Sequence, residues 1–162
     1  MGLTIAFWIL AVVAVISALG VVLLRNIFRA ALSLVLCFVT VAGLYITLSA
    51  DFLAAVQILV YVGAISVLII LAIMMTRDVQ QGSPSNKMKI PASIVAVVFL
   101  GIMIYTVVNT SWQIATEAPL TPTTAPLAFK LFSEGGFILP VEIAAVLLLA
   151  AILGAVVIAR EK

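Results

Sequence analysis

Five apolar segments, each close to the length that spans a bilayer, constrain this chain more than any other feature. A helix needs about 20 apolar residues to cross the hydrocarbon core. The segments cover residues 3–24, 30–49, 52–75, 90–110 and 138–159. Because 66% of the 162 residues are hydrophobic and only 9% are charged, little room remains for a soluble domain. We therefore predict an all-α integral membrane protein, with residues 1–162 forming a single membrane domain of five transmembrane helices and residues 111–137 forming an external loop.

The basic residues predict the orientation of this domain. If the five segments alternate in direction, seven of the eight Lys and Arg residues fall on one side of the membrane. These seven are Arg25, Arg29, Arg77, Lys87, Lys89, Arg160 and Lys162. Only Lys130 falls on the other side. Positive charge is retained on the cytoplasmic side, so we expect the N-terminus outside and the C-terminus in the cytoplasm.

The residue types that are rare or missing exclude much of enzyme chemistry. The chain has no histidine and one cysteine, Cys37. This excludes His-ligated haem and nucleophile pairs that use histidine, and it disfavours a metal site or an iron–sulfur cluster held by this chain alone. The net charge of +2 is too small to indicate nucleic acid. A stand-alone transporter usually carries charged groups in mid-membrane, and the first four segments have none well inside them.

Small polar residues in the second segment follow a helical spacing. At about 100° per residue, they fall within roughly 80° of one another. They are Ser33, Cys37, Thr40 and Thr47. The pattern favours a face that packs against a neighbouring helix, and a path for protons or water is the alternative.

Two acidic residues lie beside the apolar segments. Asp51 and Ala50 alone join the second and third segments, which predicts a tight antiparallel hairpin. The Asp51 carboxylate is expected to cap the first amides of the third segment, or else to guide ions at a channel mouth. Glu142 follows Pro140 at the start of the fifth segment. It is either a helix-start residue favoured by the helix dipole or a group that takes part in proton coupling.

The stretch QILVYVGAIS, residues 57–66, places polar groups on two sides of the third segment. On a regular helix Gln57 and Tyr61 share one face, whereas Gly63 and Ser66 lie roughly opposite. Two explanations remain open. Either protein surrounds a regular helix on both sides, or the helix is irregular around Gly63, where a π-bulge would rotate the downstream face by about 100°.

Three parts of the chain carry a resemblance to a known family. ADFLAAVQILVYVGAISVLIILAIMM (50–75) resembles the most recognisable segment of subunit J, or chain 6, of the proton-pumping type I NADH:quinone oxidoreductase. RNIFRAALSLVLCFVTVAGLYITL (25–48) and LPVEIAAVLLLAAILGAVVIAREK (139–162) resemble the second and fifth helices of that family. TSWQ (110–113) is similar to the cyanobacterial and chloroplast branch, in which ferredoxin is the electron donor.

The resemblance implies a membrane-arm subunit that is not catalytic by itself and binds no redox cofactor. NADH or ferredoxin, FMN, iron–sulfur clusters and quinone would be handled elsewhere in the complex. The expected partners are lipid, the quinone-cavity subunit, the small K-type subunit and the antiporter-like subunits. The third helix of the family contains a π-bulge at the positions of Tyr61 and Gly63, and its conversion to α-helix is thought to gate a proton route.

These implications define the candidates and the alternatives. The proton-coupling candidates are Asp51, Gln57, Tyr61, Gly63 and Glu142. The expected location is an energy-transducing membrane, with the bacterial plasma membrane favoured over the thylakoid. A stand-alone small transporter or channel and a purely structural membrane scaffold are the alternative functions.

Overall fold

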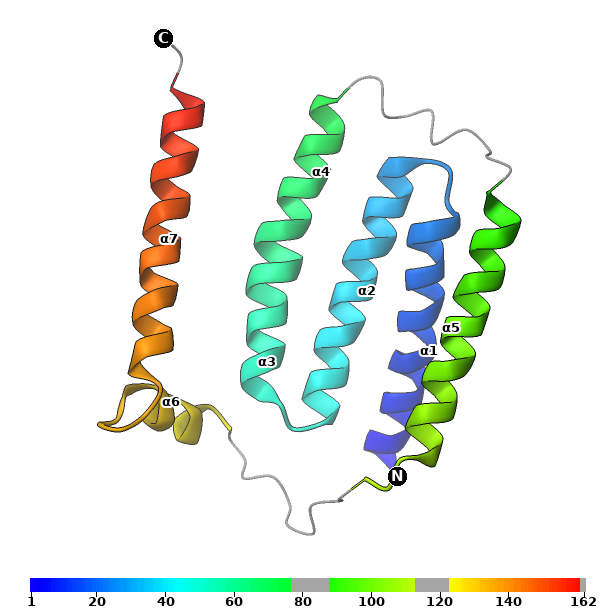
Figure 1. Cartoon of the computed structure of the whole chain (residues 1–162), viewed down its shortest axis with the longest axis horizontal. Helices are drawn as coiled ribbons and strands as arrows, with labels where there is room; N and C mark the ends of the chain where they lie inside the picture. Colours follow the sequence, from blue (N-terminus) through cyan, green and yellow to red (C-terminus); the bar gives the residue numbers. More distant parts are fainter. Residues whose placement is uncertain (77–87, 113–122, 161–162) are drawn as a thin grey trace.

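The computed structural model describes residues 1–76, 88–112 and 123–160, and its regular elements in these ranges are all helices (Figure 1). They are α1 (Gly2–Leu23), α2 (Ile27–Thr47), α3 (Asp51–Val56), the π-helix η1 (Gln57–Ile65), α4 (Ser66–Met75), α5 (Lys89–Asn109), α6 (Thr124–Phe132) and α7 (Ile138–Ala159). Five spans are long and apolar enough to cross a membrane, and the third is the continuous run of α3, η1 and α4. The all-α prediction with five spans is therefore confirmed.

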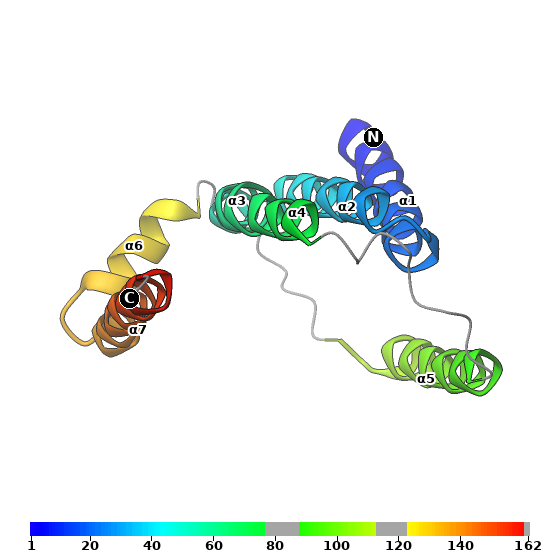
Figure 2. The ribbon, with the colours of Figure 1, turned by 90° about the horizontal axis from the view of Figure 1, so that it is seen from above.

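The first three spans form a single layer with α2 in the middle. Figures 1 and 2 show α1, α2 and the third span side by side, whereas α5 and α7 stand apart from this layer. The described residues with buried side chains all belong to the layer. They are Ser17, Ala31, Thr40, Ala42, Ala54, Gln57 and Ser66. Six of these seven are small, which lets the helix backbones approach closely.

The second span begins earlier than predicted because a side chain caps it. The Asn26 side-chain oxygen accepts a hydrogen bond from the backbone N–H of Arg29, at 3.2 Å. This bond satisfies one of the unpaired amides of the first turn, so α2 starts at Ile27 rather than at residue 30.

The polar face of α2 packs against α1. The Ser33 hydroxyl donates to the backbone oxygen of Ser17 at 2.8 Å, and the Cys37 thiol lies 3.9 Å from the backbone oxygen of Ala14. Thr40 and Thr47 turn their hydroxyls onto carbonyls of their own helix. The packing interpretation of this face is confirmed for Ser33 and Cys37.

A left-handed residue closes the turn between α2 and α3. Ser49 has a φ of 59°, and the N–H of Ala50 donates to the backbone oxygen of Tyr45 at 2.9 Å. This is a Schellman-type helix end, which uses a residue in the left-handed region to satisfy the last carbonyls. The connection is therefore Leu48–Ala50, and α3 already begins at Asp51.

The predicted capping role of Asp51 is wrong. Ala50 occupies the N-cap position of α3, and no side chain caps this helix. Asp51 is instead the first helical residue, and its side chain is exposed. An acid in this first turn still interacts favourably with the helix dipole.

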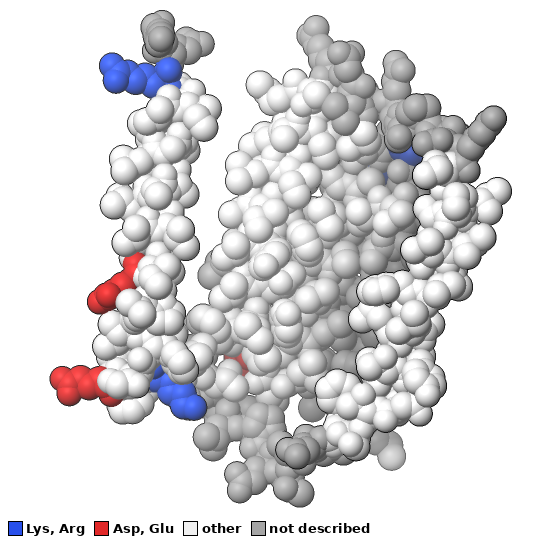
Figure 3. Space-filling model, viewed as in Figure 1, with Lys and Arg blue, Asp and Glu red and all other residues white. Residues whose placement is uncertain are grey.

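The charged residues gather at the two ends of the layer and of α7. Arg25 lies between α1 and α2 and Arg29 in the first turn of α2, at the same end as Arg160, which follows α7. Lys130 lies on α6 at the opposite end, beside the start of α7. Figure 3 shows a broad uncharged surface over the layer between these ends, and acidic atoms partway along α7. Within the range predicted as an external loop, residues 111–137, α6 forms a short helix over Thr124–Phe132.

Candidate functional site

The centre of the third span is a π-helix. It covers Gln57–Ile65, nine residues, and lies between the α-helical segments α3 and α4. The N–H of Ser66 donates to the backbone oxygen of Tyr61, five residues back, as π geometry requires. The irregularity predicted around Gly63 is confirmed, and it extends back to Gln57.

The π-helix aligns two buried polar side chains that a regular α-helix would separate. Gln57 and Ser66 are nine residues apart, which on a regular helix places them about half a turn apart. One inserted residue reduces the angle between them to about 80°. Gln57 and Ser66 are both buried, at 7% and 1% exposed, and Ala54 on the same span is buried at 4%. The helix that packs along all of α3, η1 and α4 is α2, so the buried face of the third span is the face toward α2.

Two contacts attach the first half of η1 to α2. The Gln57 side-chain nitrogen donates to the backbone oxygen of Phe38 at 3.4 Å. The ring of Tyr61 packs edge-on against the ring of Phe38, with centroids 5.5 Å apart. Phe38 therefore contacts both polar candidates of this stretch.

The second half of η1 carries a hydrogen bond within the span. The Ser66 hydroxyl donates to the backbone oxygen of Tyr61 at 2.7 Å. The same oxygen accepts the N–H of Ser66, so one serine supplies two donors to one carbonyl. Tyr61 thus links the contact with α2 to the end of the π-helix.

Gly63 lies inside η1 on an exposed side of the chain. A Cβ built at this position would lie 3.4 Å from the backbone oxygen of Ile58. This oxygen is five residues back, so the nearest contact at Gly63 is an ordinary one and comes from the π backbone itself, not from another helix. The room for a side chain larger than methyl at this position therefore depends on whether the segment is in the π or the α register.

The structure separates the two acidic candidates from η1. Asp51 lies at the start of α3, at the end of the span away from the π-helix. Glu142 is the fifth residue of α7, its side chain is exposed, and α7 stands apart from the third span (Figure 2). The candidates that come together are Gln57, Tyr61 and Gly63.

Sequence reasoning missed Phe38 as a site residue and did not select Ser66. A phenylalanine in an apolar helix carries no signal of its own. Ser66 was visible as a polar group, but a regular helix places it opposite Gln57 and away from the same partner.

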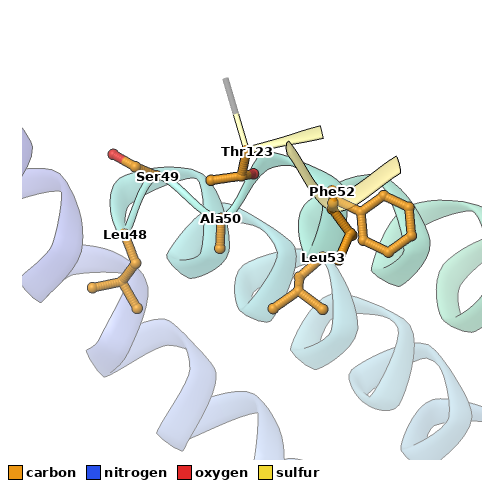
Figure 4. A pocket seen from close by; sticks show the side chains of 7 residues that line it. Leu48, Ser49, Ala50, Phe52, Leu53 and Thr123 are labelled. Atoms are coloured by element: carbon orange, nitrogen blue, oxygen red, sulfur yellow. The ribbon is translucent and has the colours of Figure 1, made fainter. Parts of the chain in front are cut away.

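A shallow groove lies at the α2–α3 turn, next to α6 (Figure 4). It has a volume of about 530 Å³ and a largely apolar lining. The lining residues are Leu48, Ser49, Ala50, Phe52, Leu53, Thr123 and Leu127. None of them belongs to η1, so this groove is separate from the π-helix.

Comparison with known proteins decides the family. The model of the NADH-ubiquinone/plastoquinone oxidoreductase chain 6 family matches residues 17–158. The chain belongs to this family. It is 40% identical over 161 residues to NAD(P)H-quinone oxidoreductase chain 6 of Leptolyngbya boryana, covering 98% of this chain and 80% of the relative. It is 41% identical over 160 residues to the chain 6 of Synechocystis, covering 97% and 80%.

An archaeal protein is similar to almost the same extent. The chain is 36% identical over 163 residues to F(420)H(2) dehydrogenase subunit J of Methanosarcina mazei, covering 98% of this chain and 92% of the relative. The names of these chain 6 relatives therefore include different electron donors.

Family membership confirms the recognition made from residues 50–75. The protein is a subunit of a multisubunit oxidoreductase complex, and the other subunits of that complex are its partners. Its five apolar spans and its photosynthetic relatives agree with a multi-pass protein of an energy-transducing membrane.

Proposed function

We propose that this chain couples quinone reduction to proton translocation in its complex, and that η1 is the element that switches. The observation that supports this most directly is the nine-residue π-helix in mid-span, with polar Gln57 and Ser66 buried at its two ends. Backbone groups freed by a π turn must be enclosed by protein or reach water, because lipid offers no partners. Such a turn is costly in a membrane helix, so its presence points to a use.

Conversion of η1 to α-helix would rotate one half of the span against the other by about 100°. The upstream half is held by the short turn to α2 and by the contacts of Gln57 and Tyr61 with Phe38. The downstream half, α4, is therefore the part that rotates. In the α register Ile65 takes the place of Ser66 against α2, which exchanges a small polar side chain for a branched apolar one. An exchange of this kind changes which path along the helix water can fill.

The residues of this chain supply structure and hydration but no electron transfer. Without histidine and with a single cysteine, the chain is expected to bind no redox cofactor. NADH or ferredoxin, FMN, iron–sulfur clusters and quinone are assigned to other subunits. The Tyr61 hydroxyl and the Gln57 amide are the groups that would order water beside η1.

The exposed helices fit contacts with other membrane subunits. The described residues of α5 and α7 include no buried side chain, although both helices are long and apolar. We assign this surface to neighbours in the complex, namely the quinone-cavity subunit, the small K-type subunit and the antiporter-like subunits, with lipid at the periphery. The basic end carrying Arg25 and Arg160 is assigned to the cytoplasm, which places the N-terminus outside.

The direct test is to determine the structure of the intact complex before and during turnover. The complex is purified in mild detergent and examined without an electron donor, and then with NADH or reduced ferredoxin together with quinone. We expect η1 in the π register in one population and in the α register in another. A single register in every resolved state would contradict the switch. Normal rates of both quinone reduction and proton pumping in the Gly63→Val variant would favour a purely structural role.

A further inference from the structure

We propose that Ser66 is a positioning residue that selects the π register of η1. The inference rests on the proposed function, because it concerns how the same segment holds one of its two registers. Ser66 is the first residue after the π-helix and the most deeply buried described side chain, at 1% exposed. It therefore lies at the junction of η1 and α4, where the register of η1 determines which face of α4 is turned toward α2.

The hydrogen bond of Ser66 differs from those of the other described hydroxyls that bond within their own helix or at its end. The others reach back three or four residues, as serine and threonine usually do in α-helices. They are Ser17 to Ala14, Thr40 to Cys37, Thr47 to Leu44, Thr76 to Ala72, Thr106 to Ile102 and Thr110 to Thr106. The Ser66 hydroxyl reaches back five residues, to Tyr61. The side chain thus repeats the i−5 bond that its own backbone N–H makes.

This pairing of donors depends on the register. In an α-helix the N–H of Ser66 would bond to Val62, and the Tyr61 carbonyl would accept from Ile65. The Ser66 hydroxyl would then follow the ordinary pattern and bond three or four residues back. The two donors of Ser66 meet at the Tyr61 oxygen only in the π register.

Burial gives Ser66 a second preference for the π register. In that register its small side chain faces α2, where 1% of it is exposed. Rotation by one residue would bring the larger, branched Ile65 to this position, so α4 and α2 would have to separate or repack. Serine combines the two properties needed here. It is small, and it carries a hydroxyl donor whose bond to Tyr61 does not compete with water, because the contact with α2 is closed.

The test compares Ser66→Ala with Ser17→Ala in the intact complex. Ser17 is a matched control, because it is 3% exposed and its hydroxyl also bonds a carbonyl of its own helix, Ala14, at 2.9 Å. Single-particle density of residues 57–66, sorted by register, gives the ratio of π to α forms without an electron donor. We expect Ser66→Ala to lower this ratio by up to about fivefold, the value of one ordinary hydrogen bond, because the hydroxyl bond three or four residues back in the α register is the less favourable of the two. Ser17→Ala is expected to leave the ratio unchanged.

A further variant keeps the test decisive. If Ser66→Ala fails to assemble, Ser66→Cys fills the same space with a weak donor and is expected to lower the ratio in its place. The kinetic readout is the rate of quinone reduction, which should change in Ser66→Ala while the KM for quinone stays constant.

The outcomes separate this inference from the proposed function. An unchanged π to α ratio in Ser66→Ala, or an equal change in Ser17→Ala, would overturn the role of Ser66 and leave the switch standing. Conversely, the wild-type complex can remain in the π register during turnover while Ser66→Ala shifts to α. That result would support the role of Ser66 and contradict the switch.

Discussion

The ring of Tyr61 in the π-helix lies edge-on to the ring of Phe38 on α2, with an interplanar angle of 71° and centroids 5.5 Å apart. The carbonyl of the same tyrosine accepts both donors of Ser66. Tyr61 therefore joins the fixed contact with α2 to the hydrogen bonds that end the π-helix. A movement of Tyr61 would disturb both contacts at once, so this residue links the packing on α2 to the end of the π-helix.

We expect Phe38→Leu and Tyr61→Leu to be non-additive. Both replacements keep an apolar side chain but remove the ring pair, which is worth ~1 kcal/mol beyond burial. Thermal dissociation of the purified complex, measured for both single variants and the double variant, gives the coupling energy. Tyr61→Phe retains the ring and serves as the control, with an effect smaller than that of Tyr61→Leu. Strictly additive effects would show that the ring contact contributes nothing specific.

The sequence predicted the spans and the irregular helix, but not its register. Length, hydropathy and charge determine the five helices, because each must satisfy its backbone within lipid. The family motif around Gly63 predicted the π-bulge. Ser66 and Gln57 share a buried face, but this follows only when the position of the extra residue in the π-helix is known. The Asp51 prediction failed because Ser49 adopts a left-handed conformation and moves the helix start by one residue, which no pattern of residue types required.

The orientation of the domain predicts which loops react with an impermeant maleimide. Single cysteines at Gln81, in the loop that lies outside the described residues, and at exposed Glu134, after α6, are introduced in a Cys37→Ser background. In intact cells only the cysteine at position 134 should be labelled, because seven of eight basic residues place the other loop inside. Permeabilised cells provide the control, in which both sites react. Labelling at position 81 alone in intact cells would reverse the topology.

We predict that Glu142→Gln lowers the number of protons pumped per electron. The side chain is exposed on α7 in this chain, and a carboxylate beside an apolar span must face protein or water to remain there. Glutamine keeps the size and hydrogen-bonding capacity but removes the charge. The measurement is proton uptake by sealed vesicles alongside quinone reduction. Normal values of both, in a complex that assembles fully, would reduce Glu142 to a residue of the helix start.

The close contact between α1 and α2 at Gly20 predicts a destabilising substitution whose effect a second substitution, at Ser33, reduces. A Cβ at Gly20 would overlap the hydroxyl of Ser33, which donates to the backbone oxygen of Ser17. Gly20→Ala should therefore destabilise the assembled complex by ~1 kcal/mol or more. Removing the hydroxyl with Ser33→Ala makes room, so the double variant should be more stable than Gly20→Ala alone.

Gly43→Ala is the control for this pair. Its Cβ would meet the side chain of Leu10, and the close contacts, at 3.0 and 3.1 Å, are with terminal methyl groups that can rotate away. Dissociation temperatures of the four complexes provide the comparison. Equal losses at positions 20 and 43 would show that the Ser33 contact is not what limits the approach of α1 and α2.

The last prediction concerns Gly63, where two substitutions of different shape should behave differently. The Cβ of Gly63→Ala would lie 3.4 Å from the Ile58 oxygen, an ordinary contact, so this variant should retain near-normal turnover. Gly63→Val adds two methyl groups with restricted rotation beside the same π backbone, and ~1 kcal/mol of crowding would shift the register ratio about fivefold. We therefore expect slower quinone reduction in Gly63→Val, with proton pumping reduced at least in parallel and assembly intact. Valine and alanine variants with the same turnover and the same density at residues 57–66 would show that the π-helix tolerates bulk at Gly63 in both registers, and the glycine would then need an explanation outside the switch.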